Sequence, residues 1–295
     1  MSKPVVGFIG LGLMGGCITG RLMETGHAVA GYDLVPAKLA AAAARGVQAC
    51  ASPAEVACAC DIVLVSVTTT AAVEEVVSGA GGIAGAGRLQ GKVLVDHSTT
   101  EIDTTKRVAA VLAAATGMDF VDAPVSGGPG AAATGTLAIM AGGEEGVIAR
   151  IRPVMEMLGR LTHLGPVGAG QATKLVNQTL VLTNYCVIAE ALRLAEAYGV
   201  DASRIPAALA PGHAGSNLLP VLFERMIARD FAPRGYARQV LKDLEMLHQA
   251  AGARHLSMPM AAQALTLYRL LIAQGKSELD GAAILTLYPE PVPAE

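Results

Sequence analysis

Lys174 is a lone charge at the start of a long apolar segment, which is a setting suited to proton transfer. The run 168–177 is glycine-rich at its start, and the segment 172–198 carries only three other charged residues. Backbone N–H groups at a helix start carry partial positive charge, so an ammonium is disfavoured there and its deprotonation is favoured. Asn177 lies three residues further on, so a helix puts the amine and the carboxamide on one face. These residues fit a general acid/base beside a ligand-orienting amide, and the alternative is a lysine that snorkels from a buried helix.

A second chemical signal lies near the N-terminus, where the sequence has the order strand, tight turn and helix. The apolar run 5–9 is followed at once by a GxGxxG pattern. In dinucleotide-binding folds the first glycine permits the turn, the second lets the backbone approach a pyrophosphate, and the third lets the helix pack on the strand. The N–H groups of the helix start then bind the phosphates. The predicted cofactor-binding residues of this loop are Gly10, Leu11, Gly12, Leu13, Met14 and Gly15.

A carboxylate follows the second predicted strand. Asp33 falls 18 residues after Gly15, close to the spacing of the acid that binds the adenosine ribose in such folds. A carboxylate at this place repels a 2′-phosphate, which predicts NAD rather than NADP as cofactor. The ordinary alternative is a loop acid that starts a turn before Pro36.

Strands and helices alternate through the first half of the chain. We predict strands at 5–9, 28–32, 62–67, 93–96, 119–122 and 137–141, with helices at 15–25, 36–45, 53–59, 71–77, 104–115 and 144–158. This alternation predicts an α/β fold with a mostly parallel, doubly wound sheet of the Rossmann type.

The strand signals end near residue 165, and the rest of the chain is predicted to be helical. The expected helices lie at 170–198, 202–209, 218–229, 237–251 and 258–274, with a short one near Asp280. We therefore predict two domains. Residues 1–165 form the NAD-binding domain, and residues 166–295 form an all-helical substrate and oligomerisation domain built on one long helix.

Polar or glycine-rich loops follow three of the predicted strands. Ligands of open α/β sheets bind beyond the carboxyl ends of the strands, so the loops at 67–70, 96–99 and 122–130 are candidates. Val67 and Thr68 are predicted cofactor contacts, although ordinary turn chemistry is the favoured explanation of 67–70 taken alone. The run Ser126-Gly127-Gly128 exposes successive backbone N–H groups, which suits a small carboxylate, and ordinary turn chemistry explains this run equally well.

Composition narrows the class of protein. The chain has 295 residues, of which 52% are hydrophobic and 16% are charged, and a net charge of −3. It has 3% aromatic residues and no tryptophan, so we expect no nucleic-acid partner. The five cysteines and six histidines have no metal-ligand spacing, so no metal is predicted. We expect a cytoplasmic protein without a membrane span, because polar residues interrupt the long apolar helix. The apolar surplus of that helix predicts a homodimer or homotetramer.

The motifs together resemble the β-hydroxyacid dehydrogenases, which include 3-hydroxyisobutyrate dehydrogenases and tartronate semialdehyde reductases. Residues 8–15 resemble the cofactor signature of that family, 122–128 the substrate signature, 170–177 the catalytic signature, and 242–244 the last motif. The four motifs occur in the family's order over nearly the whole chain. The resemblance implies an NAD(H)-dependent oxidoreductase that interconverts a small β-hydroxy acid and its semialdehyde.

The resemblance also implies roles for single residues. Lys174 would be the catalytic acid/base, Thr99 would lie by the nicotinamide, and Lys242 would contact cofactor or substrate. The carboxylate-bearing substrate would be bound by Ser126, Gly127, Gly128 and Asn177. The runs 214–216 and 177–178 are most similar to the tartronate semialdehyde reductase branch. The family commonly has asparagine at the position of Arg21, which bears on the packing beside the cofactor.

Three other classes of protein share this motif order in part. A 6-phosphogluconate dehydrogenase has a larger helical domain than this chain can form. An imine reductase usually has another residue at the position of Lys174, and a non-catalytic NAD-binding module usually lacks the lysine. The substrate stays open among tartronate semialdehyde, methylmalonate semialdehyde, threonate and related β-hydroxy acids.

Overall fold

The computed structural model describes residues 4–290, which form two compact units. The units divide within one long helix, between Lys174 and Leu175. The sequence prediction placed the domain boundary at 165/166, and this helix begins at Ala169. Lys174 therefore belongs to the first unit, and Asn177 belongs to the second.

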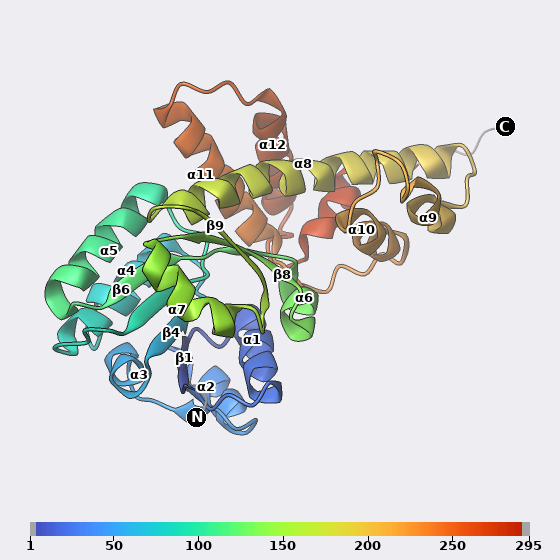
Figure 1. Cartoon of the computed structure of the whole chain (residues 1–295). Coiled ribbons are helices and arrows are strands. Elements are labelled where there is room, and N and C mark those ends of the chain that lie inside the picture. The colour runs from blue at the N-terminus through green and yellow to red at the C-terminus, as the bar shows by residue number, and fades with distance from the viewer. Residues whose placement is uncertain (1–3, 291–295) are drawn as a thin grey trace. The chain divides into compact units, whose positions relative to one another are not determined.

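The first unit alternates strands and helices around one sheet (Figure 1). Its elements in chain order are β1 (Val6–Ile9), α1 (Leu13–Glu24), β2 (Val29–Tyr32), α2 (Pro36–Ala43), β3 (Gln48–Ala49), α3 (Pro53–Ala59), β4 (Ile62–Val65), α4 (Thr70–Ser78), β5 (Val93–Asp96), α5 (Ile102–Thr116), β6 (Asp119–Asp122), β7 (Val125–Ser126), α6 (Gly128–Thr134), β8 (Leu137–Gly142), α7 (Glu145–Met155) and β9 (Gly159–Gly165). A 3₁₀ turn at Ile83–Gly85 lies between α4 and β5.

The strands follow the order β3-β2-β1-β4-β5-β6-β8-β7, and β9 pairs with β8. Neighbouring strands from β3 to β6 are parallel, whereas β8 is antiparallel to β6 and β7. The chain first runs outward from β1 to β3 and then returns to β4 on the other side of β1. This reversal confirms the predicted doubly wound fold, and it sets a ligand-binding edge at the carboxyl ends of β1 and β4.

The central strands are buried on both faces, so their side chains alternate between two cores. Phe8 and Leu64 pack in one core with α1, α2 and α7, while Ile9 and Val65 pack in the other with α3, α4 and α5. Such continuous apolar strands are typical of a parallel sheet covered by helices on both sides.

Three strands and one α-helix of the first unit were not predicted from the sequence. The strands β3 and β7 have two residues each, so they carry no periodic pattern. The strand β9 contains the polar residues Arg160, Thr162 and His163, and its pairing with β8 is what defines it. The helix α6 begins Gly-Pro-Gly, which resembles a turn.

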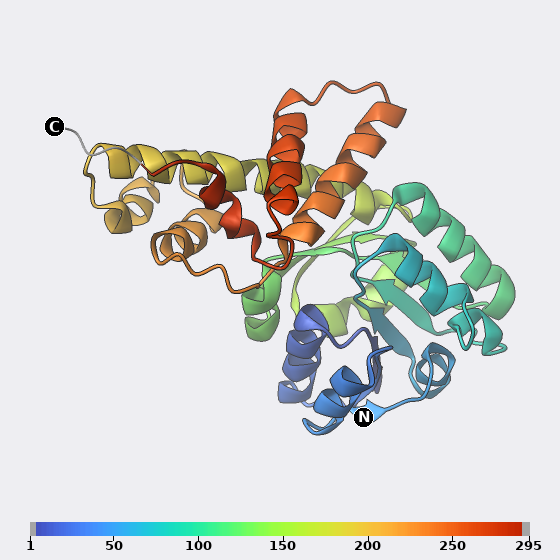
Figure 2. The same ribbon diagram turned by 180° about the vertical axis from the view of Figure 1, so that it is seen from behind.

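The second unit is helical, as predicted. It contains the long helix α8 (Ala169–Ala197) from residue 175 onward, α9 (Ile205–Leu209), α10 (Leu218–Ile227), α11 (Ala237–Ala253), α12 (Pro259–Ala273) and the 3₁₀ segment η3 (Gly281–Leu287), with a 3₁₀ turn at Ala202–Arg204. Side chains from α8, α10, α11, α12 and η3 meet in one apolar core. Figure 2 shows α11 and α12 as a pair of neighbouring helices.

Helix α8 is long and apolar enough to cross a membrane by length and composition alone. Its 29 residues extend about 43 Å. Leu182, Ile188 and Leu192 of this helix belong to the core of the second unit, so its composition is also that of a helix packed inside a domain. Leu180, Val187 and Leu194, seven residues apart, are exposed. They form an apolar stripe, and assembly through it stays a prediction.

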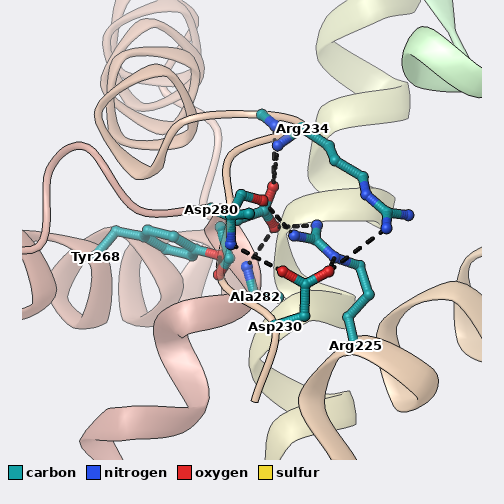
Figure 3. A network of polar contacts seen from close by, with 9 residues as sticks. Arg225, Asp230, Arg234, Tyr268, Asp280 and Ala282 are labelled. Atoms are coloured by element: carbon teal, nitrogen blue, oxygen red, sulfur yellow. Dashed lines mark hydrogen bonds and ion pairs between the residues drawn. The ribbon is translucent and has the colours of Figure 1, made fainter. Parts of the chain in front are cut away.

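A buried ion pair fixes the end of the second unit (Figure 3). The Arg225 guanidinium on α10 lies 2.7 Å from Asp280 Oδ1, and both side chains are almost fully buried. Asp280 Oδ1 also accepts the N–H of Ala282, while Oδ2 accepts the N–H groups of Arg234 and Gly235. These four partners are all donors, and together they tie η3 to the loop before α11.

We predict that Asp280→Asn destabilises the protein by about 3 kcal/mol, since it removes the negative charge 2.7 Å from the Arg225 guanidinium and turns an amide NH₂ toward backbone donors. Urea unfolding measures this change. The matched control is Glu278→Gln, which removes an exposed ion pair with Arg238 and should cost less than about 1 kcal/mol. Equal midpoints for the two variants would contradict the prediction.

Candidate active site

The glycine loop between β1 and α1 has the close backbone contacts expected of a nucleotide-binding turn. Gly10 has φ 95°, and a Cβ there would collide with the carbonyl of Ser66 at the end of β4. A Cβ at Gly15 would collide with the Gly10 carbonyl and lie 2.8 Å from the Phe8 ring. At Gly12, in contrast, a Cβ would meet no atom within 4 Å. Open space therefore lies beside the helix start at Gly12, where a pyrophosphate fits.

The other residues of this loop differ in exposure. Leu11 is buried in the core, Met14 is half-buried and Leu13 is exposed. Asp33 lies half-buried after β2, and its carboxylate accepts the N–H of Leu11 at 2.7 Å and that of Val35 at 2.8 Å. The structure thus joins Asp33 to the glycine loop, and each carboxylate oxygen accepts one backbone N–H.

Two further predicted cofactor loops are linked to each other. Val67 follows β4, and its N–H donates to the Ser98 hydroxyl at 3.0 Å. Ser98 in turn donates its N–H to Asp96 Oδ1 at 2.9 Å. Thr68 is exposed and Thr99 is half-buried at this edge of the sheet. These bonds bring the loops after β4 and β5 together.

Lys174 lies beside the predicted substrate loop within the first unit. Its side chain is 8% exposed, and Nζ donates to the Val125 carbonyl at 2.8 Å. Ser126 is the next residue and ends β7. Gly127 and Gly128 follow with φ 125° and 68°, and a Cβ at Gly127 would lie 2.5 Å from that of Ala131. The amine is therefore one residue away from a loop that only glycine can form without strain.

The start of α8 is held by a residue that the sequence analysis left without a role. Asp122 ends β6 and is fully buried. Its Oδ1 accepts the N–H of Gly168 at 2.7 Å, and its Oδ2 accepts that of Gln171 at 2.8 Å. Helix starts leave such N–H groups without intrahelical partners, so Asp122 satisfies two of them from another element.

Gln171 adds a second link between α8 and the sheet edge. Its side-chain Nε2 donates to the Ser98 carbonyl at 2.9 Å, and its Oε1 accepts the N–H of Thr100 at 3.1 Å. Gln171 is buried. The first turn of α8 is thereby fixed to the ends of both β5 and β6. The sequence feature that could have indicated this role is the position of the glutamine within the predicted catalytic motif, three residues before Lys174.

The remaining predicted residues belong to the second unit. Asn177 Nδ2 donates to Gln178 Oε1 at 2.8 Å, and Gln178 Nε2 donates to Asp243 on α11 at 2.5 Å. Asp243 also forms an ion pair with Lys242 at 3.0 Å. Asn177 and Lys242 are therefore linked through Gln178 and Asp243, a contact that spacing alone did not predict.

Two other features bear on the sequence predictions. Arg21, the departure from the family pattern, donates Nε to the Met157 carbonyl after α7 at 3.1 Å, so it joins α1 to another part of the first unit. Across residues 4–290, no group of three His, Cys, Asp or Glu side chains could hold a metal ion.

An apolar cavity of about 520 Å³ opens along the C-terminal half of α8. Its lining includes Tyr198, Leu209, Phe223 and Ser216. The Ser216 hydroxyl accepts the N–H of Leu219 at the start of α10. The first α8 residue of the lining is Asn184, seven positions and about 10 Å along the helix from Asn177. This cavity is therefore separate from the polar residues described above.

Burial shifts the pKa values of three groups at the ends of β5 and β6. Desolvation raises the pKa of Asp96 to about 7 and that of Asp122 to about 6. It lowers the pKa of His97 to about 4, so the imidazole is neutral at neutral pH, with Nδ1 2.7 Å from the Ala123 carbonyl. Within the described residues, Asp96 Oδ2 has no hydrogen-bond partner, which accords with a carboxyl group that favours its neutral form.

Comparisons with known proteins agree with this arrangement. Residues 5–170 match the family described as "NAD binding domain of 6-phosphogluconate dehydrogenase", and residues 168–288 match "NAD-binding of NADP-dependent 3-hydroxyisobutyrate dehydrogenase". The chain is 38% identical over 283 residues to 2-hydroxy-3-oxopropionate reductase of Escherichia coli (strain K12), covering 95% of each protein. It is 36% identical over 294 residues to 2-(hydroxymethyl)glutarate dehydrogenase of Eubacterium barkeri, covering 98% of this chain and 97% of that protein.

A solved structure is similar over the same length. The 3-hydroxyisobutyrate dehydrogenase of Mycobacterium tuberculosis, with L-serine, superimposes with a TM-score of 0.83 at 31% identity, covering 97% of this chain and 100% of that chain. The fold and these matches identify the chain as an oxidoreductase that uses NAD(P) and acts on CH–OH groups. The chain belongs to the 3-hydroxyisobutyrate dehydrogenase family, the β-hydroxyacid dehydrogenases.

Because the pKa of Asp96 is raised, we predict that the protein becomes less stable as pH rises. Its ordinary pKa is 3.8 and its value in the folded protein is about 7, so between these values the folded state binds more protons than the unfolded state. The free energy of unfolding should therefore fall as pH rises through this window, with a slope of up to about 1.4 kcal/mol per pH unit from this one group.

Asp96→Asn mimics the neutral carboxyl group and should remove this contribution. We expect the loss of stability between pH 5 and pH 8 to be smaller in Asp96→Asn than in the unmodified protein, as measured by urea unfolding at each pH. Asp61→Asn, at an exposed position before β4, is the control and should keep the original slope. Parallel pH profiles for all three proteins would show that Asp96 does not titrate in this range.

Proposed function

We propose that this chain is an NAD-dependent dehydrogenase that interconverts a small β-hydroxy acid and its semialdehyde, of the 3-hydroxyisobutyrate or tartronate semialdehyde type, with Lys174 as general acid/base. The observation that carries this proposal is the buried amine of Lys174 at 2.8 Å from the Val125 carbonyl, one residue before the Ser126 loop. A proton-transferring group is thereby held next to a loop suited to a small carboxylate.

The names of the relatives support this substrate class. 2-(Hydroxymethyl)glutarate carries a CH₂OH group, and 2-hydroxy-3-oxopropionate carries an aldehyde, each on the carbon next to a carboxyl group. L-Serine, present in the mycobacterial structure, has the same CH₂OH group beside its α-carbon. The proposed substrate therefore consists of a carboxylate and, one carbon away, the alcohol or aldehyde that reacts.

Each proposed residue has a distinct task in this reaction. Ser126 and the N–H groups at Gly127 and Gly128 would bind the carboxylate, and Asn177 would orient the reacting oxygen. In alcohol oxidation, the neutral amine of Lys174 takes the hydroxyl proton; in reduction, its ammonium returns a proton to the alcohol oxygen. The bound nicotinamide supplies the hydride acceptor or donor. Lys242 and Thr99 would contact the cofactor.

The cofactor-binding part of the proposal is supported by the first unit. The open space at Gly12 and the N–H groups of the α1 start suit a pyrophosphate, and Asp33, which is hydrogen-bonded to this loop, would bind the ribose. Val67 and Thr68 would line the same edge. Because Asp33 is already held by the N–H groups of Leu11 and Val35, its negative charge is fixed in place and opposes a 2′-phosphate.

We predict that kcat/KM is higher with NAD than with NADP, and that Asp33→Asn narrows the difference because it removes the repelling charge while keeping one acceptor oxygen. Steady-state rates of the two proteins with both cofactors and one β-hydroxy acid measure this effect. Asp61→Asn serves again as an exposed control. Equal kcat/KM for NAD and NADP in the unmodified enzyme would refute the role given to Asp33.

We predict that Lys174→Ala lowers kcat by about 10²- to 10⁴-fold and leaves the affinity for NADH nearly unchanged, because only proton transfer is lost. NADH absorbance with a panel of small semialdehydes measures turnover, and thermal unfolding of the same preparation reports folding. The control is Lys106→Ala, which removes another lysine near the start of α8. A folded Lys174→Ala protein with most of its turnover would mean that the acid/base is another group, and Lys242 would be examined next.

A further inference from the structure

We infer that Asp122 is a positioning residue for Lys174, and that it acts by holding the first turn of α8 against the end of β6. This inference rests on the proposed function, because it concerns how the acid/base is kept in place. Asp122 lies within the sequence run similar to the family's substrate signature, yet its buried carboxylate contacts the helix that carries Lys174. All the atoms involved lie within the first unit.

The geometry makes Asp122 a two-point clamp. Oδ1 and Oδ2 accept N–H groups from Gly168 and Gln171, which lie three residues apart across the helix start. Lys174 is one helical turn further along, three residues after Gln171. The same β6 strand leads within three residues to Val125, whose carbonyl accepts the Lys174 amine. The lysine is therefore fixed twice relative to one strand end, through its backbone and through its amine.

The helix start packs closely against the clamp. A Cβ on Gly170 would collide with the carbonyls of Met140 and Asp122, and would lie 2.9 Å from Asp122 Oδ2. A Cβ on Gly142 would lie 2.6 Å from Asp122 Oδ1 and 2.7 Å from the Pro166 carbonyl. Glycine at both places allows backbone to approach backbone, and the carboxylate fills the remaining space.

A carboxylate is the side chain that this arrangement requires. Both oxygens of an ionised carboxylate accept, whereas an amide has one acceptor and one NH₂ group. In Asp122→Asn the NH₂ group would face the N–H of either Gly168 or Gln171, so one of these buried donors would lose its partner. The helix start would then shift by a fraction of an ångström or more, and Lys174 would shift with it.

The test is a double-mutant cycle of Asp122→Asn and Lys174→Ala with NADH and a small semialdehyde. We expect Asp122→Asn alone to lower kcat by about 10- to 100-fold, the size expected of a misplaced catalytic group, with NADH affinity within about twofold of the unmodified enzyme. In the Lys174→Ala background the same substitution should lower kcat no further, because there is no amine left to misplace.

The pH dependence of kcat gives a second readout. If the environment of the amine changes in Asp122→Asn, the limb of the profile that reports the general acid/base should move along the pH axis. A purely structural loss would lower the whole profile without moving it. Asp119→Asn is the matched control, because Asp119 begins the same strand, lies partly exposed and pairs with Arg150 at 2.9 Å. It should leave kcat and the profile unchanged.

The outcomes separate this inference from the proposed function. Full turnover in folded Lys174→Ala would overturn the proposed function itself. A Lys174→Ala protein that loses turnover, together with an Asp122→Asn protein that keeps kcat within about twofold, would overturn only the positioning role. Equal fold losses from Asp122→Asn in both backgrounds would do the same. If Asp122→Asn does not fold, Asp122→Ser, which keeps one acceptor without an opposing NH₂ group, is carried through the same cycle.

Discussion

The start of α8 is the constraint on which the candidate active site depends. A helix start exposes N–H groups that need acceptors, and at the start of α8 the N–H groups of Gly168 and Gln171 are buried. Asp122 supplies both acceptors for Gly168 and Gln171 from the end of β6. Because Asp122 is fully buried, the contact excludes side chains at Gly142 and Gly170. The glycine-rich approach to Lys174 follows from this close packing.

The sheet makes such a contact possible by bringing distant loops to one edge. Parallel strands end on the same side, so the loops after β1, β4, β5 and β6 gather there. The Val67 N–H donates to the Ser98 hydroxyl, and the Gln171 side chain donates to the Ser98 carbonyl. These two bonds join the loop after β4, the loop after β5 and the start of α8. Both faces of the sheet are covered by apolar cores, which leaves the strand ends as the place for polar chemistry.

The sequence predicted the elements with a strong local pattern and missed those that depend on distant partners. The bounds of β5, β6 and α3 agree with the prediction at every residue, because each is a short patterned run between clear breaks. The strand β9 carries polar residues and exists through its pairing with β8. The Asp122 clamp joins residues 46 positions apart, and no spacing rule connects them. The link of Asn177 to Asp243 through Gln178 was invisible for the same reason.

The two units contribute polar networks of different kinds along α8. Near Lys174, the Val125 carbonyl accepts the lysine amine, and the buried carboxylate of Asp122 holds the start of the helix. Asn177 is linked to the side chain of Gln178 and through it to that of Asp243. A single substitution at either residue changes the number of hydrogen-bond donors and acceptors in this network. The substrates named for the relatives share their reacting end and differ in the group attached to it. Under the proposed function, the contacts of Asp122 would keep the reacting group in place, and substitutions at Gln178 or Asp243 would change the side chains that neighbour Asn177 and with them the substrate preference.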